Sequence, residues 1–392
     1  MSSFGAKRVL IVAMAAMAET AGSFVRAEIL AARLVEKGFA VATCMAEDVN
    51  YKPLPNVKNY FLEVPSPLGL PRFISKRTFP LAQKFGLTAG KRVNSFDDVL
   101  FFTGNSSYTY LKKSIQNIRQ AIKAFNPDIV YSEFNLSAVI AAKLEQRIVF
   151  ASASFPTQPE YAVSPQFSGA LNRILAENNL PKVSSALEIF KQADRRFVPS
   201  IKELEPFEDN SVVFCGSWKH QKLPECSLQN KNKVLMYMGS GSISAKKMTA
   251  EISKAFSALP YEVYIAAKGH SEESHGNIHI ASRWNFAELL PEAALYIHHG
   301  GQNSTADSFV YGVPQLIYPG RVFERIFNAS SVEKNGAGLV IPFKEFSAEV
   351  IRKKAEAIFA DSTFAEKACN IGALLVQQGG ADKVLEAVRN IK

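Results

Sequence analysis

The chain has few cysteines, no long apolar run and no Asp-x-Asp triplet. Its four cysteines are scattered, so we expect neither a zinc site nor a disulfide framework and prefer free thiols in a reducing compartment. No apolar stretch reaches about 18 residues, so no membrane-spanning helix is predicted. Without an Asp-x-Asp triplet, a metal ion held by such a pair is not expected either.

Length and composition describe a two-domain globular protein. At about 100–200 residues per domain, a chain of 392 residues is long enough for two. Apolar residues make up 47% and charged residues 21%, which suffices for two buried cores. The net charge of +9 suits anionic ligands or an anionic membrane face, whereas the basic runs are too short to predict a nucleic-acid partner.

The N-terminus has two interpretations. Lys7 and Arg8, followed by the apolar run 9–18, resemble a secretory signal. We favour a buried first strand over 9–13, because the chain continues as a helix over 24–37. The protein is then expected in the cytoplasm, either free or peripheral to the inner membrane face.

Strand-like and helix-like segments alternate in both halves of the chain. In the first half, strands are predicted over 39–44, 128–132 and 148–154, with a helix over 110–125. In the second half the alternation restarts with a strand over 234–238. Such alternation indicates the α/β class, with parallel sheets covered by helices on both faces.

A polar stretch rich in proline and glycine over 196–226 separates the two halves. Two helices are expected to close the chain over 347–392. The domain boundaries predicted from this pattern are a first domain over 1–205, a linker over 206–226, a second domain over 227–375 and a C-terminal helix over 376–392 that can pack back on the first domain.

Residues 72–95 mix aromatic and basic side chains. The plainer interpretation is an insertion that packs on its own domain. The functional interpretation is a flap that contacts an acceptor or a membrane, because basic and aromatic residues together suit an anionic interface.

The most informative segment begins with His298-His299-Gly300-Gly301, which ends a strand and opens a helix. Glycines let a ligand approach the backbone, and the first N–H groups of a helix have no acceptor within it. Together with the helix dipole, these groups favour a phosphate. Asp307 lies further along, where its carboxylate can accept hydrogen bonds from ribose hydroxyls. A Gly-Gly turn taken alone is explained equally well by an ordinary turn that connects a strand to a helix.

The wider segment resembles the nucleotide-sugar signature of the UDP-glycosyltransferase family, glycosyltransferase family 1, and especially its bacterial antibiotic-type and macrolide-type members. The resemblance is strong over residues 230–345 and weak before residue 190. It implies the GT-B architecture, in which two Rossmann-like parallel-sheet domains face a central cleft. The matching residues are Leu289-Leu290-Pro291, His298-His299-Gly300-Gly301, Asn303-Ser304, Gly312-Val313-Pro314, Pro319, Glu324, Asn328-Ala329 and Gly336-Ala337-Gly338.

The resemblance also implies which residues hold the donor. Asp307 would hold the ribose, where the family usually has Glu, and Arg325 replaces the usual Gln beside the sugar, so the sugar stays open. His298 is expected to be a packing residue. The remaining donor contacts would be His299, Gly300, Gly301, Asn303 and Ser304 on the diphosphate, the turn Gly239-Ser240-Gly241-Ser242 on the phosphates, Arg283 and Trp284 at the base, and Glu324 at the sugar.

The histidine that the family uses as general base is missing. Its position falls at Ser23, whose hydroxyl cannot take a proton near neutral pH, and no histidine precedes His220. Three explanations stay open. A carboxylate, Glu133 or Glu19, acts as the base directly; or the acceptor is already ionised, as a phosphate or an acidic phenol is; or catalysis has been lost.

The family resemblance therefore implies an inverting, metal-independent transfer of a hexose from a UDP- or TDP-sugar to a small-molecule or lipidic acceptor. The nucleotide sugar is a co-substrate, and no cofactor is expected. The alternative is a non-catalytic relative that binds nucleotide sugars or assists an active transferase. A nucleotide-sugar 2-epimerase shares the fold, but the signature disfavours it. The sequence leaves the donor base, the acceptor and the oligomeric state open.

Overall fold

A computed structural model describes residues 7–15, 22–48, 51–70, 92–220, 231–239 and 243–391. Its backbone contacts divide the chain into two compact units. The first unit holds the described residues up to 70, residues 95–219 and residues 378–391; the second holds residues 92–94 and the described residues from 220 to 377. The division after residue 219 falls within the stretch expected as the linker, 206–226.

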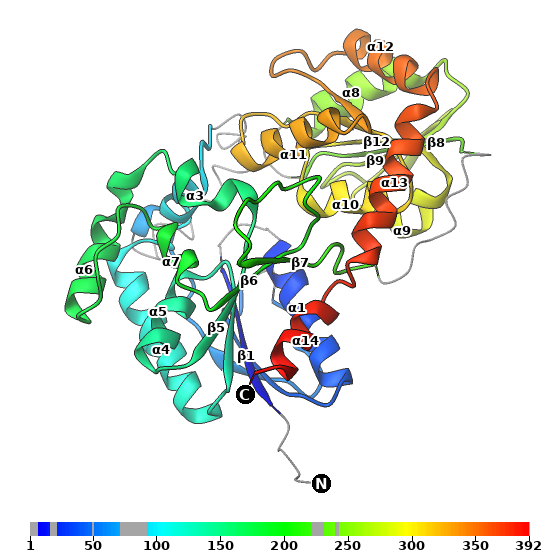
Figure 1. Ribbon diagram of the computed structural model, residues 1–392. Helices are drawn as coiled ribbons and strands as arrows, with labels where there is room; N and C mark the ends of the chain where they lie inside the picture. The colour runs from blue at the N-terminus through cyan, green and yellow to red at the C-terminus, as the bar shows by residue number, and fades with distance from the viewer. Residues whose placement is uncertain are drawn as a thin grey trace. The chain divides into compact units, whose positions relative to one another are not determined.

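Seven parallel strands form the sheet of the first unit, in the order β3-β2-β1-β4-β5-β6-β7 (Figure 1). The strand order reverses between β1 and β4, and open sheets of this kind bind ligands beyond the carboxyl ends of their strands at that point. The strands are β1 (Arg8–Ala13), β2 (Ala40–Met45), β3 (Lys58–Phe61), β4 (Ile129–Glu133), β5 (Ile148–Ser152), β6 (Arg195–Val198) and β7 (Val212–Phe214).

Helices cover both faces of this sheet. The helices α1 (Gly22–Glu36) and α14 (Asp382–Arg389) lie on one face, where Leu30, Leu34 and Val388 join the core (Figure 1). Helices α4 and α5 lie on the other face. The further helices of this unit are α3 (Phe96–Phe102), α4 (Tyr108–Phe125), α5 (Leu136–Leu144), α6 (Gly169–Glu177), α7 (Glu188–Lys191) and the short η1 (Pro67–Gly69), η2 (Phe155–Thr157), η3 (Pro159–Tyr161) and η4 (Pro165–Ser168).

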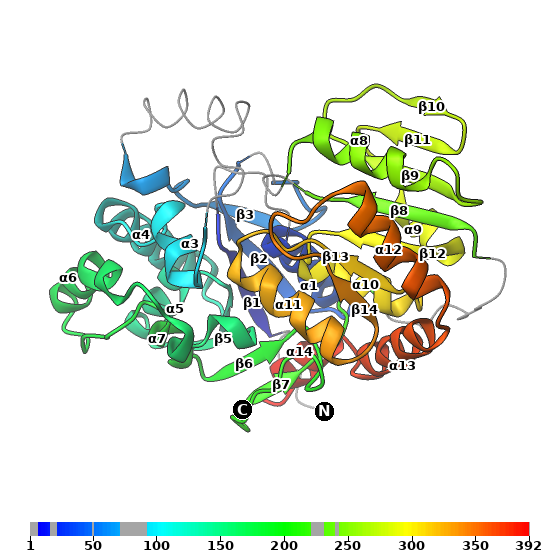
Figure 2. The same cartoon turned by 90° about the horizontal axis from the view of Figure 1, so that it is seen from above.

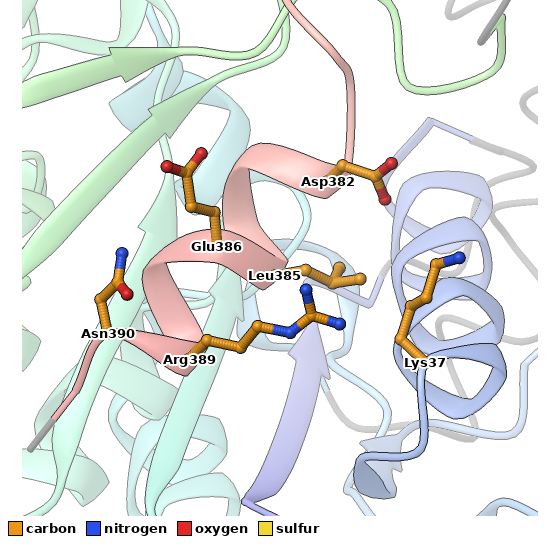
Figure 3. A pocket seen from close by; sticks show the side chains of 6 residues that line it. All are labelled: Lys37, Asp382, Leu385, Glu386, Arg389 and Asn390. Atoms are coloured by element: carbon orange, nitrogen blue, oxygen red, sulfur yellow. The ribbon is translucent and has the colours of Figure 1, made fainter.

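The end of the chain returns to the first unit through α14. Arg33 on α1 donates two hydrogen bonds to the carboxylate of Asp382, at 2.7 and 2.8 Å, which ties the two helices together. Beside this pair lies a shallow cavity of about 190 Å³ (Figure 3). Charged and polar side chains dominate its lining, which consists of Lys37, Asp382, Leu385, Glu386, Arg389 and Asn390.

The second unit repeats the Rossmann strand order, with β10-β11-β9-β8-β12-β13-β14 across its sheet. All pairings are parallel except the β10–β11 hairpin, which Figure 2 shows at the sheet edge. The order reverses between β8 and β12. The strands are β8 (Lys233–Tyr237), β9 (Glu262–Ala266), β10 (Glu273–His275), β11 (Ile278–Ala281), β12 (Ala293–His298), β13 (Gln315–Ile317) and β14 (Gly338–Val340).

Two helix layers enclose this second sheet (Figure 1). On one face, Ile252 and Phe256 of α8 pack with Ile351 of α12 against the strands. On the other face, α13 packs so closely on α10 that a Cβ at Gly372 would lie 2.1 Å from the carbonyl oxygen of Phe309. The elements are α8 (Ala245–Phe256), α9 (Phe286–Leu289), η5 (Leu290–Glu292), α10 (Gln302–Val310), α11 (Phe323–Lys334), α12 (Ala348–Phe359) and α13 (Thr363–Gln377).

The predicted α/β class with two Rossmann-like parallel-sheet domains is confirmed. Two details are corrected. The closing segment is three helices rather than two, because Gly379 and Gly380 both take positive φ and separate α13 from α14. Cys44 and Cys215 are free and buried as expected, but Cys369 is disulfide-bonded.

Two expectations concern membranes. Within the described ranges, every helix is too short or too polar to cross a lipid bilayer. The basic and aromatic flap expected over 72–95 lies almost entirely outside the described residues.

Candidate functional site

The turn between β12 and α10 is held by the start of α11. Gly300 has φ +84°, a conformation that other residues rarely adopt, and a Cβ there would lie 2.9 Å from the carbonyl oxygen of Arg325. The side-chain amide of Asn328 donates a 2.8 Å hydrogen bond to the carbonyl oxygen of Gly300. The turn therefore has a fixed shape, and only glycine suits its centre.

His298 lies completely buried beneath this turn. Its Nδ1 accepts a 3.0 Å hydrogen bond from the N–H of Gly300, so Nε2 carries the proton and donates to Oε1 of Gln315 at 2.9 Å. Burial lowers the pKa of His298 to about 4, so the ring is neutral. The expected role of Gly300 changes accordingly, because its N–H is occupied by His298 and does not face a phosphate.

Helix α10 begins directly after Gly301. The N–H groups of Gln302, Asn303 and Ser304 belong to its first turn, where they have no acceptor within the helix, and the helix dipole favours an anion there. Asn303 is exposed, whereas Ser304 is half-buried and its Oγ lies 3.4 Å from the Tyr296 hydroxyl. The helix start is thus open to a ligand on one side.

The imidazole of His299 lies between two glycines. A Cβ at Gly301 would lie 2.6 Å from its Nε2, and a Cβ at Gly239 would lie 3.2 Å from its Cε1. Burial lowers the pKa of His299 well below its usual value, and the positive charge of Arg325 lowers it further. Its Nδ1 is buried and has no hydrogen-bond partner among the described residues. A buried polar atom without a partner costs about 1–3 kcal/mol, which an oxygen of a bound diphosphate would offset.

The first turn of α11 carries two charged residues. Glu324 and Arg325 are both half-buried at the start of this helix. Burial lowers the pKa of Arg325, while the neighbouring Glu324 raises it again in part. A guanidinium has a pKa above about 12 and stays charged, so Arg325 places a cation beside His299.

Asp307 lies in the second turn of α10 and already has a partner. Its Oδ1 accepts a 2.7 Å hydrogen bond from Nε2 of His220, and the two side chains are only 16% and 11% exposed. The His220 ring also packs edge-on against Tyr311, with ring centroids 5.5 Å apart. The carboxylate expected to hold the ribose is therefore oriented by His220, to which the sequence pattern assigns no role.

The residues expected at the base follow the carboxyl end of β11. The indole N–H of Trp284 donates to the carbonyl oxygen of Ile265 at 3.1 Å, and its ring meets Tyr264 edge-on at 5.2 Å. Arg283 is exposed. Of the turn expected to contact the phosphates, only Gly239 lies within the described residues; Ser240, Gly241 and Ser242 do not.

In the first unit, Glu133 is fully buried in an ion pair. Its Oε1 accepts from Nε and Nη2 of Arg26, both at 2.7 Å, and its Oε2 accepts from the Ser152 hydroxyl. The Tyr131 hydroxyl donates to Ser152 in turn, at 2.8 Å. Burial raises the pKa of Glu133, and Arg26 lowers it again in part. An acceptor hydroxyl cannot reach this carboxylate as it is placed, which argues against the expected role of Glu133 as a direct base.

Ser23 lies half-buried in the first turn of α1, one turn before Arg26. Glu19, the other candidate base, lies outside the described residues. Sequence reasoning missed Arg26, although its spacing of three from Ser23 places both on one helix face. It also missed Tyr237, a residue that is 39% exposed at the end of β8 and whose ring meets His299 edge-on at 5.6 Å.

Known proteins resemble this chain in sequence and in fold. A family model, the C-terminal domain of erythromycin biosynthesis protein CIII-like proteins, matches residues 254–388. The uncharacterized UDP-glucosyltransferase YojK of Bacillus subtilis (strain 168) is 36% identical over 106 residues, which are 26% of this chain and 26% of YojK. The NDP-glycosyltransferase YjiC of the same organism is 22% identical over 298 residues, 70% of this chain and 76% of YjiC. The match to YojK thus spans only a quarter of that relative.

Solved structures match nearly the whole chain. The glycotransferase of kitacinnamycin has a TM-score of 0.73 and 14% identity, with 98% of both chains covered. The spinosyn rhamnosyltransferase SpnG, complexed with thymidine diphosphate, has a TM-score of 0.69 and 16% identity, with 98% of this chain and 100% of that chain covered. These likenesses show the GT-B fold of two Rossmann-like domains. The family-model match over residues 254–388 and the curated relatives support a member of the UDP-glycosyltransferase family, glycosyltransferase family 1.

Proposed function

We propose that this chain is an inverting, metal-independent glycosyltransferase that moves a hexose from a UDP- or TDP-sugar to a small-molecule or lipidic acceptor. The observation that carries the proposal is the turn between β12 and α10. It brings together the helix start, a neutral His299 whose Nδ1 has no hydrogen-bond partner within the described part of the chain, and the cationic Arg325. The names of YojK, YjiC and SpnG agree with a nucleoside diphosphate donor.

In this scheme the departing diphosphate is the group that the site stabilises. The acceptor oxygen attacks the anomeric carbon from the face opposite the diphosphate, and the bond from that carbon to the diphosphate oxygen breaks. The nucleoside diphosphate leaves with the bonding electron pair, and the anomeric centre inverts. Arg325, His299 and the N–H groups at the start of α10 would stabilise the charge that develops.

The proton of the acceptor needs a separate explanation. Because Glu133 is buried against Arg26, we infer an acceptor that ionises on its own, such as a phosphate or an acidic phenol, and gives up its proton to solvent. Glu19 is the alternative base, and Ser23 would then contact the acceptor rather than accept its proton.

One observation favours a second function. Ser23 stands where the family keeps its histidine, and Glu133 is paired with Arg26 rather than with a histidine. A non-catalytic relative that binds a nucleotide sugar, or assists an active transferase, would not need the catalytic pair.

Turnover assays separate the two functions. Purified protein is incubated with UDP-glucose or TDP-glucose and either 4-nitrophenol, an aliphatic alcohol or a lipid phosphate, and free nucleoside diphosphate and glycoside are measured. We expect glycoside formation with the acidic acceptors and no change on adding EDTA. Nucleotide binding without turnover on any acceptor would favour the binding protein, and loss of activity with EDTA would refute metal independence.

A further inference from the structure

Three polar side chains at the β10–β11 hairpin form a hydrogen-bonded chain. Nε2 of His279 lies 2.7 Å from Oε2 of Glu262, and Nδ1 of the same ring lies 2.9 Å from the hydroxyl oxygen of Ser274. A carboxylate only accepts hydrogen bonds, so in the neutral ring Nε2 carries the proton and Nδ1 accepts one from Ser274. The chain thus contains a nucleophile, a base and a carboxylate that orients the base, which is the arrangement that activates a serine for acyl transfer.

The strand register places these side chains on one face of the second sheet. Ser274 on β10 is paired with His279 on β11, which in turn is paired with Tyr264 on β9. Residues two apart on a strand share a face, so Glu262 lies on the same face as Tyr264. The Tyr264 ring stacks on the imidazole, with centroids 4.8 Å apart and planes 26° apart. The base is therefore held both by this stacking and by the carboxylate.

The hydroxyl of Ser274 is accessible to a ligand, because the residue is exposed and β10 is the last strand in the order of its sheet. The carbonyl oxygens of Asn277 and Ala281 accept hydrogen bonds from β9, so by alternation the main chain of His279 also faces β9. Ser274, which lies opposite His279, accordingly points its N–H away from β11, toward the edge where the described strands end. That N–H can donate to the oxyanion that forms when the hydroxyl attacks a carbonyl carbon.

We propose that Ser274 is acylated by small esters with a good leaving group, at an acyl-transfer site that the proposed glycosyl transfer does not use. Nδ1 of His279 takes the hydroxyl proton as the Ser274 oxygen bonds to the ester carbonyl carbon. The bond from that carbon to the alcohol oxygen breaks, and the proton passes from His279 to the departing alcohol. Water then attacks the acyl-serine by the same route, which releases the carboxylic acid and restores the hydroxyl. The open position of Ser274 suits short acyl groups.

4-Nitrophenyl acetate tests the proposal, because its cleavage releases a coloured phenolate and leaves an acetyl group on the attacking residue. In protein quenched with acid, we expect mass spectrometry of peptides to find the acetyl group on Ser274. The steady rate of phenolate release should fall about tenfold or more in Ser274→Ala and in His279→Gln, because general base catalysis contributes about 10²–10⁴-fold. Ser274→Cys should still be acetylated at residue 274, since a thiol is also a nucleophile.

Ser271→Ala and His275→Gln are the matched controls, because both residues are exposed close to Ser274. Both variants should keep the wild-type rate and the acetyl group on Ser274. Absence of acetyl from Ser274 in the wild type overturns the proposal, as does an equal steady rate in Ser274→Ala and Ser271→Ala. Wild-type acetylation of Ser274 in His279→Gln would refute the role of the base. If Ser274→Ala does not fold, the position of the acetyl group and Ser274→Cys decide.

Discussion

The imidazole of His299 occupies the space that a side chain at residue 301 would need, since a Cβ on Gly301 would lie 2.6 Å from Nε2 of His299. Contacts that close almost never occur between real side chains. The glycine that opens α10 therefore serves the histidine beside it as well as the approach of a ligand to the backbone.

Gly301→Ala should displace the His299 ring and weaken the binding of UDP by about tenfold, the value of one hydrogen bond to a charged group. The cost in stability should be small, on the order of 1 kcal/mol, because φ at Gly301 is −68° and suits alanine. Calorimetry and thermal unfolding measure the two effects. Gly169→Ala is the control, since a Cβ there meets nothing within 4 Å; wild-type affinity in Gly301→Ala would show that the ring does not contact the ligand.

The buried His298 predicts a specific dependence of stability on pH. Its pKa is about 4 in the folded chain and near the ordinary value of about 6.5 in the unfolded chain. Above about pH 6.5 the ring is neutral in both states and contributes nothing to the dependence. As the pH falls from about 6.5 to 4, only the unfolded chain takes up the proton, so the free energy of unfolding should decrease by about 3 kcal/mol.

Urea denaturation at several pH values measures this decrease. The variant His298→Gln removes the proton that this residue takes up on unfolding. The free energy of unfolding should therefore change less between pH 6.5 and 4, although His299 retains a contribution of the same sign. His275→Gln, which replaces an exposed histidine, should follow the wild-type curve. An identical pH dependence in His298→Gln and the wild type would contradict the buried neutral ring.

The Arg26–Glu133 pair is expected to matter for stability rather than for proton transfer. Arg26→Leu and Glu133→Gln should each lower the free energy of unfolding by about 3–5 kcal/mol, because each leaves a buried partner uncompensated. The double variant Arg26→Met/Glu133→Leu removes both charges and should recover much of that loss. Urea denaturation measures the stabilities.

Activity measurements distinguish a Glu133 that only stabilises the fold from a Glu133 that acts as the catalytic base. A catalytic base would show a large fall in kcat, on the order of 100-fold or more, in a Glu133→Gln protein that keeps its stability. A large fall in kcat at unchanged stability would identify Glu133 as the base that deprotonates the acceptor. A loss of activity that follows the loss of stability would support the structural ion pair instead.

The fold was predictable where each strand or helix is long and regularly patterned. The first strand, the helix now seen as α4 and the strand–turn–helix of β12 and α10 all follow from local apolar periodicity. The strands β7, β10 and β14 have only three residues each, which is too short for any period to register. The polar stretch 196–226 was predicted as a boundary, yet β7 lies within it, because pairing with β6 rather than composition makes Val212–Phe214 a strand.

The candidate site also has a part that the sequence predicts and a part that it does not. The residues from His298 to Ser304 are contiguous, so one local pattern predicts them together. His220 and Asp307 are 87 positions apart, and Arg26 and Glu133 are 107 apart. Such pairs leave no local signal, because only the assembled sheet brings their elements together. The occupied N–H of Gly300 could not be foreseen either, because it depends on the orientation of the His298 ring two residues away and not on the glycine pair.

The most direct test of the donor site is calorimetric titration of UDP and TDP into the wild-type chain and into His299→Ala, with His275→Ala as the control. We expect binding to the wild type and the control, and an affinity about tenfold or more weaker in His299→Ala, because the neutral imidazole contributes a hydrogen bond to the charged diphosphate. Equal affinities in all three proteins would mean that the diphosphate does not lie against the turn between β12 and α10.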